Sequence, residues 1–411
     1  MEFLKSLVSL ELGVYLRTVW GAAPWVEVVI DLLGIIAVST FCLLIVLFLI
    51  WLERKVIARI QDRLGPNRVG RYGWLQTVAD VLKLLTKETI TPIGADKVAY
   101  NLAPLLVVMA ALWMWAVVPF APGLIGADLN IGLFYLLAVS SASVVCILLA
   151  GWGSNNKYAL LGAFRSVAQL VSYEVPMVLA LVVPILLARS MSTESIIQAQ
   201  AVPFLLVVPL SALIFFISAL AETGRTPFDL LEAESEIVAG FHIEYSGMKF
   251  GMFFLAEFIG ALLMSALFTT IYLGGYRFFG LEQLDLGGWK VGHLIGLAVF
   301  FIKTFSMYFV FIWVRATLPR VRIDQLLDFN WKLLVPLSLV LVLTVAIVDK
   351  LIPTGATTWA RALVHLASNI VVGLVTVEIL RRRGRQQREA LEGAMADETT
   401  LTPEYELSAH H

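Results

Sequence analysis

Long apolar runs are the feature that most constrains the fold of this 411-residue chain. A bilayer-spanning helix needs about 20 mostly apolar residues. Nine segments have or approach that length, near residues 32–52, 98–120, 129–152, 167–188, 199–221, 250–276, 294–314, 333–350 and 360–380. Only 15% of the residues are charged, whereas about one quarter is usual in soluble domains. The sequence therefore predicts an all-α polytopic membrane protein with about nine transmembrane helices.

The distribution of lysine and arginine predicts how these helices are oriented. Of the 30 basic residues, 22 fall in alternate loops and the C-terminal tail, and seven fall on the opposite side. Basic loops are retained in the cytoplasm, so we expect the N-terminus outside and the C-terminus inside. We further expect an amphipathic leader over 1–27, a transmembrane domain over 28–380, and a polar, disordered cytoplasmic tail over 381–411.

Two cytoplasmic loops carry signs of local structure. Residues 53–63 alternate apolar and polar faces, which predicts a short helix on the membrane surface. At the start of that segment, Glu53 and Arg54 are expected to form an adjacent ion pair. Further along, Asp229 and Glu232 have capping-box spacing, so a helix is expected to start there.

Several kinds of site are excluded by what the sequence lacks. The two cysteines, Cys42 and Cys146, lie far apart inside apolar runs, which excludes a disulfide framework or a cysteine-ligated cluster within the chain. No dinucleotide-binding, P-loop or zinc-protease motif is present. We therefore expect no metal site and no nucleotide site.

An acid-dense loop lies between two of the apolar runs. Its six carboxylates are Glu222, Asp229, Glu232, Glu234, Glu236 and Glu244. In a helix, Glu232 and Glu236 would share a face, and like charges at that spacing titrate as a coupled unit. The alternative is a solvated acidic loop, but apolar residues interleave with the acids from Ile237 to Phe241. We interpret the loop as a buried functional cluster.

Three of the spanning segments each carry one charged residue in an otherwise apolar run, where a charge is costly and usually marks an ion or proton path. Glu174 and Glu257 are therefore candidate proton-relay carboxyls, although either could instead be solvated at the membrane interface. Lys303 lies in mid-span and is expected to have a partner within the membrane.

Several blocks together resemble one known family. They include Trp51-Leu-Glu-Arg-Lys, Arg63-Leu-Gly-Pro-Asn-Arg-Val-Gly and Gly151-Trp-Gly-Ser-Asn-Asn-Lys. Further blocks lie at 79–84, 172–174, 221–257 and 312–326. Their order and spacing are similar to those of the quinone-chamber subunit of respiratory complex I, the proton-translocating NADH:quinone oxidoreductase. That subunit is called H in bacteria and subunit 1 in mitochondria.

The resemblance assigns roles to individual residues. It implies a quinone chamber lined by Glu53, Arg54, Asp80, Lys83, Arg225 and Arg315, with Arg225 pairing with loop acids. It implies proton coupling through Glu174, Glu222, Asp229, Glu232, Glu234, Glu236, Glu244, Glu257 and Lys303. One departure concerns the third helix, because some relatives carry a glutamate near Ser141 and this chain has none.

The resemblance also implies a setting in a larger assembly. The substrate would be ubiquinone or menaquinone, with NADH, FMN and iron–sulfur clusters bound only by partner subunits. Partners would be the peripheral-arm subunits at the quinone site, small membrane-arm subunits and lipid of the bacterial cytoplasmic membrane, but not nucleic acid.

Two other functions fit part of the pattern. A proton-coupled secondary transporter would also bury acids, yet transporters often show inverted repeats and none is visible. The anchor subunit of a membrane-bound hydrogenase would share the acidic loop without needing a quinone, and the intact segment from Glu53 to Asn67 argues against it.

Overall fold

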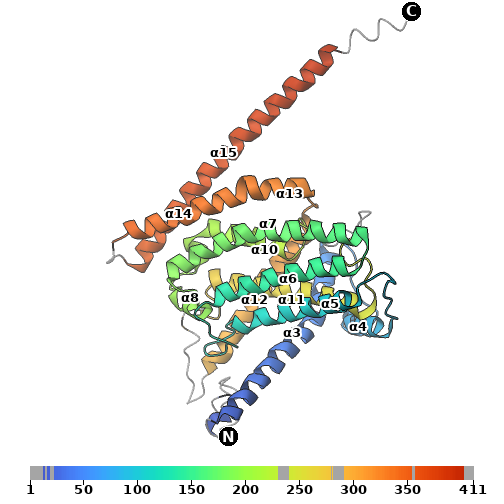
Figure 1. Ribbon diagram of the computed structural model, residues 1–411. Helices are drawn as coiled ribbons and strands as arrows, with labels where there is room; N and C mark the ends of the chain where they lie inside the picture. Colours follow the sequence, from blue (N-terminus) through green and yellow to red (C-terminus); the bar gives the residue numbers. More distant parts are fainter. Residues whose placement is uncertain are drawn as a thin grey trace, which may run out of the picture.

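The described part of the chain is mostly helical in the computed structural model (Figure 1). The structure describes residues 13, 16–18, 23–229, 240–278, 280, 291–353 and 357–401, and it gives only the backbone of 291, 387 and 389–401. The helices of at least seven residues are α3 (Pro24–Ile60), α4 (Gln76–Thr86), α5 (Lys97–Trp113), α6 (Gly132–Gly153), α7 (Lys157–Ala188), α8 (Thr193–Ala199), α10 (Pro209–Glu222), α11 (Gly247–Tyr272), α12 (Val291–Thr317), α13 (Ile323–Phe329), α14 (Val335–Leu351) and α15 (Thr358–Leu401).

Eight helical stretches in the described part of the chain are long and apolar enough to cross a membrane. They are Pro24–Ile60, Lys97–Val117, Gly132–Gly153, Lys157–Ala188, Gly247–Tyr272, Gly292–Thr317, Ile323–Leu351 and Thr358–Gln386. This confirms the predicted all-α polytopic fold.

The run predicted to span from residue 199 to 221 is broken in the structure. A short helix, α9 (Phe204–Val207), precedes α10, and the 14 residues of α10 are fewer than a full span. Pro203 and Pro209 flank α9, and proline lacks the backbone donor that a continuous helix needs at those positions. The break brings Glu222 to the C-terminal end of a short helix rather than to the end of a long one.

The surface helix predicted over 53–63 is not a separate element. Residues 53–60 continue α3 without interruption, and the chain turns only afterwards, before Gly65 and Pro66. Nothing between Trp51 and Ile60 disfavours a helix, so the span continues past the end of its apolar run. The separate helix of this loop is α4, whose Val78, Leu82 and Leu85 side chains are exposed.

The C-terminal tail also differs from expectation over its first part. α15 continues as a helix to Leu401, where the sequence led us to expect disorder from residue 381. Arginine, glutamine, alanine and glutamate favour helix, and Arg382 pairs with Glu378 one turn earlier at 3.0 Å. Residues 402–411, most of 1–22, and the helix expected to start near Glu232 lie outside the described residues.

Five helices, α5, α6, α7, α10 and α11, pack together and hold most of the core (Figure 1). α3 and α15 run obliquely away from this bundle at opposite sides of the view. Both helices expose long rows of apolar side chains, among them Trp25, Ile35, Leu363 and Leu374. The polar groups described next lie where α3, α6, α11 and α12 meet the end of α10.

Candidate functional site

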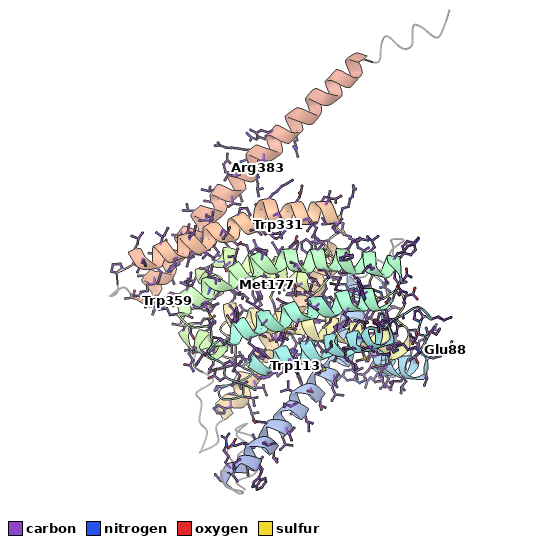
Figure 2. The ribbon with its side chains drawn as sticks, viewed as in Figure 1. Glu88, Trp113, Met177, Trp331, Trp359 and Arg383 are labelled. Carbon is purple, nitrogen blue, oxygen red and sulfur yellow. The ribbon has the colours of Figure 1, made fainter. Side chains whose placement is uncertain are left out.

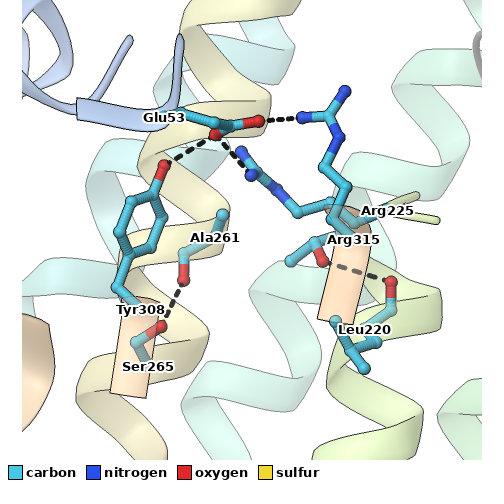
Figure 3. Close-up of polar contacts among 8 residues, drawn as sticks. Glu53, Leu220, Arg225, Ala261, Ser265, Tyr308 and Arg315 are labelled. Carbon is cyan, nitrogen blue, oxygen red and sulfur yellow. Dashed lines mark hydrogen bonds and ion pairs between the residues drawn. The ribbon is translucent and has the colours of Figure 1, made fainter. Parts of the chain in front are cut away.

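A buried ion cluster centres on Glu53 of α3 (Figure 3). The Glu53 carboxylate accepts a hydrogen bond from Arg225 Nη1 at 2.5 Å and one from the Tyr308 hydroxyl at 3.1 Å. Its other oxygen pairs with Arg315 at the end of α12. Glu53 is 3% exposed, and Arg225 and Tyr308 are 0% exposed. Two guanidinium groups therefore share one carboxylate inside the protein.

The loop after α10 is braced so that Arg225 points into this cluster. The Arg225 guanidinium lies over the rings of Phe258 and Tyr308, 5.0 and 5.6 Å from their centres. The fully buried Gln169 of α7 donates to the carbonyl oxygens of Ala221 and Phe228 at 2.8 and 2.7 Å. Some of the loop acids that were expected to pair with Arg225 lie in residues 230–239. These residues are outside the described part of the chain, so their pairing with Arg225 stays a prediction.

The expected ion pair between Glu53 and Arg54 is wrong. Consecutive residues on a helix point about 100° apart, so Glu53 faces the interior while Arg54 faces outward. Arg54 instead pairs with Asp80 of α4 at 2.6 Å. Trp51 and Trp74 lie beside this pair with ring centres 5.6 Å apart, and Lys83 is exposed further along α4. The predicted chamber residues thus divide into a buried group around Glu53 and a more exposed group at α4, made of Arg54 from α3 with Asp80 and Lys83 from α4.

A cavity of about 120 Å³ lies between α5, α6, α11 and the end of α10. Glu222 and Glu257 both line it, together with Ser140, Ser143 and a set of apolar side chains. A space of this size holds several water molecules, and the two carboxyls and two hydroxyls supply polar partners for them. Arg225, Arg315 and Glu53 act electrostatically on Glu257, so the cavity and the ion cluster form one connected site.

Two consecutive serines of α6 each contact a different carboxyl. Ser140 donates to Glu222 Oε1 at 2.9 Å, and Ser141 donates to Glu174 of α7. Ser140 is buried, whereas Ser141 lies at the side surface of the bundle. These hydroxyls occupy the level at which some members of the resembled family carry a glutamate. Glu222 and Glu174 thus lie close enough across α6 for the charge of one to act on the other.

The remaining described acids of the loop are held by other partners. Asp229 pairs with Arg320 at 2.8 Å, and Glu244 accepts a hydrogen bond from Asn156 at 2.5 Å. The hydroxyl of Tyr100 donates to the Glu244 carbonyl oxygen at 2.8 Å. Glu232, Glu234 and Glu236 lie outside the described residues, so their roles stay predictions.

Lys303 has partners inside the membrane region, although not at the acid cluster. Its ammonium donates to the carbonyl oxygens of Leu273, Gly275 and Arg277 at 2.8, 3.0 and 2.7 Å. A cation at a helix C-terminus complements the helix dipole. Leu273 follows Glu257 by 16 residues, or about 24 Å of helix, so Lys303 lies at the C-terminal end of α11, whereas the cavity lies along the middle of that helix.

Sequence reasoning missed several residues of this site, namely Tyr308, Ser140, Gln169 and Arg320. Two of these had a sequence signal, because Ser140 belongs to a group of three serines inside an apolar run and Tyr308 carries a hydroxyl within a span. Gln169 and Arg320 had none, since only the fold shows which carbonyl or carboxylate they reach.

Among the residues that the structure describes, no group of three or more histidine, cysteine, aspartate or glutamate side chains is arranged to hold a metal ion. Cys42 and Cys146 are separate buried thiols on α3 and α6.

Comparison with known proteins assigns this architecture to a family. The family model described as NADH dehydrogenase matches residues 33–346. The H subunit of NADH-quinone oxidoreductase from Dehalococcoides mccartyi strain CBDB1 is 49% identical over 316 residues, which cover 77% of this chain and 85% of that protein. Its counterpart from Rhodospirillum centenum is 48% identical, covering 76% and 91% of the two chains. The counterpart from Rickettsia canadensis is 46% identical, covering 77% and 93%.

Proposed function

Because this chain belongs to the NADH dehydrogenase family, as a multi-pass membrane subunit of NADH-quinone oxidoreductase, we propose that it forms the quinone chamber of that complex and couples quinone reduction to proton translocation. It is a protein of the bacterial cytoplasmic membrane. The proposal assigns NADH, FMN and iron–sulfur clusters to partner subunits and quinone, as the substrate, to this one.

The observation that carries the proposal is the cavity shared by Glu222 and Glu257 beside the Glu53 ion cluster. Reduction of a quinone to a quinol takes up two electrons and two protons. Negative charge that appears during this step acts strongly on nearby ionisable groups in a low-dielectric setting. Glu257 already lies within the electrostatic range of Arg225 and Arg315. A change of charge in the chamber would therefore alter proton binding at the cavity.

The exposed group on α4 supports a position for the chamber wall. The Arg54–Asp80 pair, the paired rings of Trp51 and Trp74, and the apolar side of α4 lie together at one end of the bundle. Such a mixed apolar and charged surface suits a quinone, whose ring is polar and whose tail is apolar. In this proposal the peripheral-arm subunits complete the chamber over that surface.

The serine pair supports a direction for proton movement. Glu222 in the interior and Glu174 near the side of the bundle each accept a hydrogen bond from one of two consecutive serines, and the charge of Glu174 acts on Glu222. A carboxyl is costly at a lipid-facing surface, so we assign the neighbourhood of Glu174 to contact with another membrane-arm subunit. Protons or charge would leave this subunit there.

The experiment replaces Glu222 by glutamine in the assembled complex. Glutamine retains the size and hydrogen bonding of the side chain but cannot titrate. Quinone reductase activity and the proton gradient in sealed vesicles should fall together by about tenfold or more, while NADH oxidation by a water-soluble artificial acceptor stays at the wild-type rate.

Two serines supply a matched control. Ser140 and Ser143 both line the cavity, but the Ser143 hydroxyl donates to the Ser140 carbonyl oxygen at 2.7 Å rather than to an acid. We expect Ser140→Ala to slow quinone reduction severalfold and Ser143→Ala, which removes no hydrogen bond to an acid, to slow it much less. If Glu222→Gln, Glu174→Gln and Ser140→Ala all kept wild-type rates of quinone reduction and proton pumping, the cavity would have no role in coupling. That outcome would refute the proposal.

A further inference from the structure

The membrane-spanning part of α15 has two distinct faces. His365, Asn369, Val372 and Thr376 are buried or half-buried on the side that packs toward the bundle. Ile370, Leu374 and Val377 are exposed on the other side. Residues at intervals of three and four lie on one face of a helix, so each set forms a continuous stripe. The exposed stripe is apolar throughout and matches a surface that touches hydrocarbon.

The exposed stripe continues directly into a row of arginines. From Val377, steps of four, four and three residues along the helix reach Arg381, Arg385 and Arg388. All three are exposed. The structure therefore aligns apolar side chains and guanidinium groups along one side of a single helix, opposite the side that packs on the protein. Figure 2 shows this part of α15, with Arg383 labelled, projecting from the bundle.

The distance along the helix places the arginines at a membrane boundary. Trp359 begins the exposed face and is 66% exposed beside the turn between α14 and α15 (Figure 2). Arg381 follows it by 22 residues, or about 33 Å of helix. The hydrocarbon layer of a bilayer is about 30 Å thick, and tryptophan is enriched at its borders. Arg381 then lies where the helix leaves the hydrocarbon, at the depth of the lipid phosphates.

We propose that Arg381, Arg385 and Arg388 form a binding site for the headgroups of anionic phospholipids, whose acyl chains lie along the exposed stripe of Ile370, Leu374 and Val377. Guanidinium groups bind phosphate oxygens in a bidentate manner. A basic cluster immediately beyond a transmembrane helix attracts anionic lipid. The combination of an apolar stripe and a charged row on the same side fits a lipid molecule, which carries both parts in one structure.

The placement favours lipid over an acidic protein partner. The arginine row lies on the side of α15 that faces away from the bundle, in line with residues that face hydrocarbon. A protein partner would need to cover the apolar stripe and the arginines together. The proposal is independent of the quinone chemistry, because α15 lies beyond residue 346, where the match to the family model ends.

The chain offers a matched control within the same turn of helix. Arg382 is paired with Glu378 at 3.0 Å, and Arg383 continues the side that carries His365 and Asn369. The variants R381Q/R385Q and R382Q/R383Q each remove two positive charges from neighbouring positions. Only the first pair removes charges from the lipid-facing row, so a general loss of charge is separated from loss of the site.

The test uses the assembled complex reconstituted in phosphatidylcholine vesicles at low salt. One preparation contains a photoactivatable phosphatidylglycerol and another a photoactivatable phosphatidylcholine with the same reactive acyl chain. After illumination, the lipid attached to residues 359–380 is quantified by mass spectrometry. We expect labelling by phosphatidylglycerol to exceed labelling by phosphatidylcholine about fivefold for each engaged arginine.

R381Q/R385Q should lower this ratio about 25-fold, to the roughly fivefold preference that Arg388 alone supplies, and R382Q/R383Q should keep most of it. Added salt should lower the wild-type ratio. An equal ratio in wild type, equal losses in both double variants, or cross-links from the arginine row to another subunit in place of lipid would each overturn the proposal. Should R381Q/R385Q fail to assemble, R385Q/R388Q gives the same readout, because both positions lie beyond the last apolar residue of the span.

Discussion

Glu53 holds two guanidinium groups inside the protein and joins three distant parts of the chain. Arg225 is 172 residues away in sequence and Arg315 is 262 residues away. The fully buried Arg225 would carry a large desolvation cost without the carboxylate, and the partly exposed Arg315 would carry a smaller one. The cluster thereby fixes the end of α3 against α12 and the loop after α10. It also places positive charge within range of Glu257.

Replacing Glu53 by glutamine should destabilise this junction by about 3–5 kcal/mol, since it leaves the fully buried Arg225 and the partly exposed Arg315 without their counter-charge. Tyr308→Phe removes one hydrogen bond to the same carboxylate and should cost about 1 kcal/mol. The yield of intact complex after mild heating in detergent measures both. Equal yields for the two variants would show that the ion cluster contributes little beyond its hydrogen bonds.

The sequence pointed to the residues of this cluster but did not show which of them pair. Glu53, Arg225 and Arg315 were all expected at the chamber because a charged residue at the end of a span is conspicuous and the family blocks contain them. Their mutual contact could not be predicted, because it depends on how α3 and α12 cross. The adjacent pairing of Glu53 with Arg54 was wrong because it ignored the direction in which successive helical residues point.

At the scale of an element, the segment from Gly240 to Ser246 is held against α7 and α11. A Cβ atom on Gly162 of α7 would lie 2.5 Å from the carbonyl carbon of Gly240, so glycine is required for this close approach. His242 follows, with its ring 5.3 Å from that of Phe241 and 5.2 Å from that of Phe250. Burial among these rings lowers the pKa of His242 to about 4.

This shift makes the docking of the segment pH-dependent. The pKa of His242 in the folded protein lies below its ordinary value of 6.5, so protonation favours the undocked segment. The stabilisation that neutral, buried His242 gives to the docked segment is complete above about pH 6.5 and is lost as the pH falls toward 4. Local opening measured by hydrogen exchange over 240–246 should become easier by about 1–2 kcal/mol between pH 7 and pH 5. In His242→Phe this dependence should vanish, and its persistence would assign the effect to another group.

The sequence predicted helices well where a long apolar run determines them. It predicted the ends of helices poorly where prolines or turns determine them. The long apolar runs became helices as expected, because a membrane leaves the backbone few alternatives. The break before α10 depends on Pro203 and Pro209, which a count of apolar residues passes over. The continuation of α3 to Ile60 was missed because polarity was taken as the end of the helix, whereas the turn at Gly65 and Pro66 ends it.

At the scale of the whole molecule, the buried and exposed halves of the proposed chamber should be separable. Arg54→Ala or Asp80→Ala breaks a partly exposed ion pair that α3 and α4 share, while the Glu53 cluster stays intact. Quinone reduction by the complex should fall severalfold with unchanged NADH oxidation by an artificial acceptor. Arg59→Ala, which removes an exposed arginine one turn later on α3, should leave both activities unchanged. Loss of both activities together would indicate failed assembly instead.

The serine pair of α6 has a consequence for the timing of charge movement along the proposed route. A carboxyl can accept a proton and wait, because it is stable in both protonation states. A serine hydroxyl is stable in neither charged form near neutral pH, so it can only pass a proton on as it receives one. Ser140 donates to Glu222 and Ser141 donates to Glu174, so neither serine is itself a resting place for charge. Along the proposed route charge would therefore rest only on the two carboxyls, and a proton gained by one would be felt by the other through the electrostatic interaction between them.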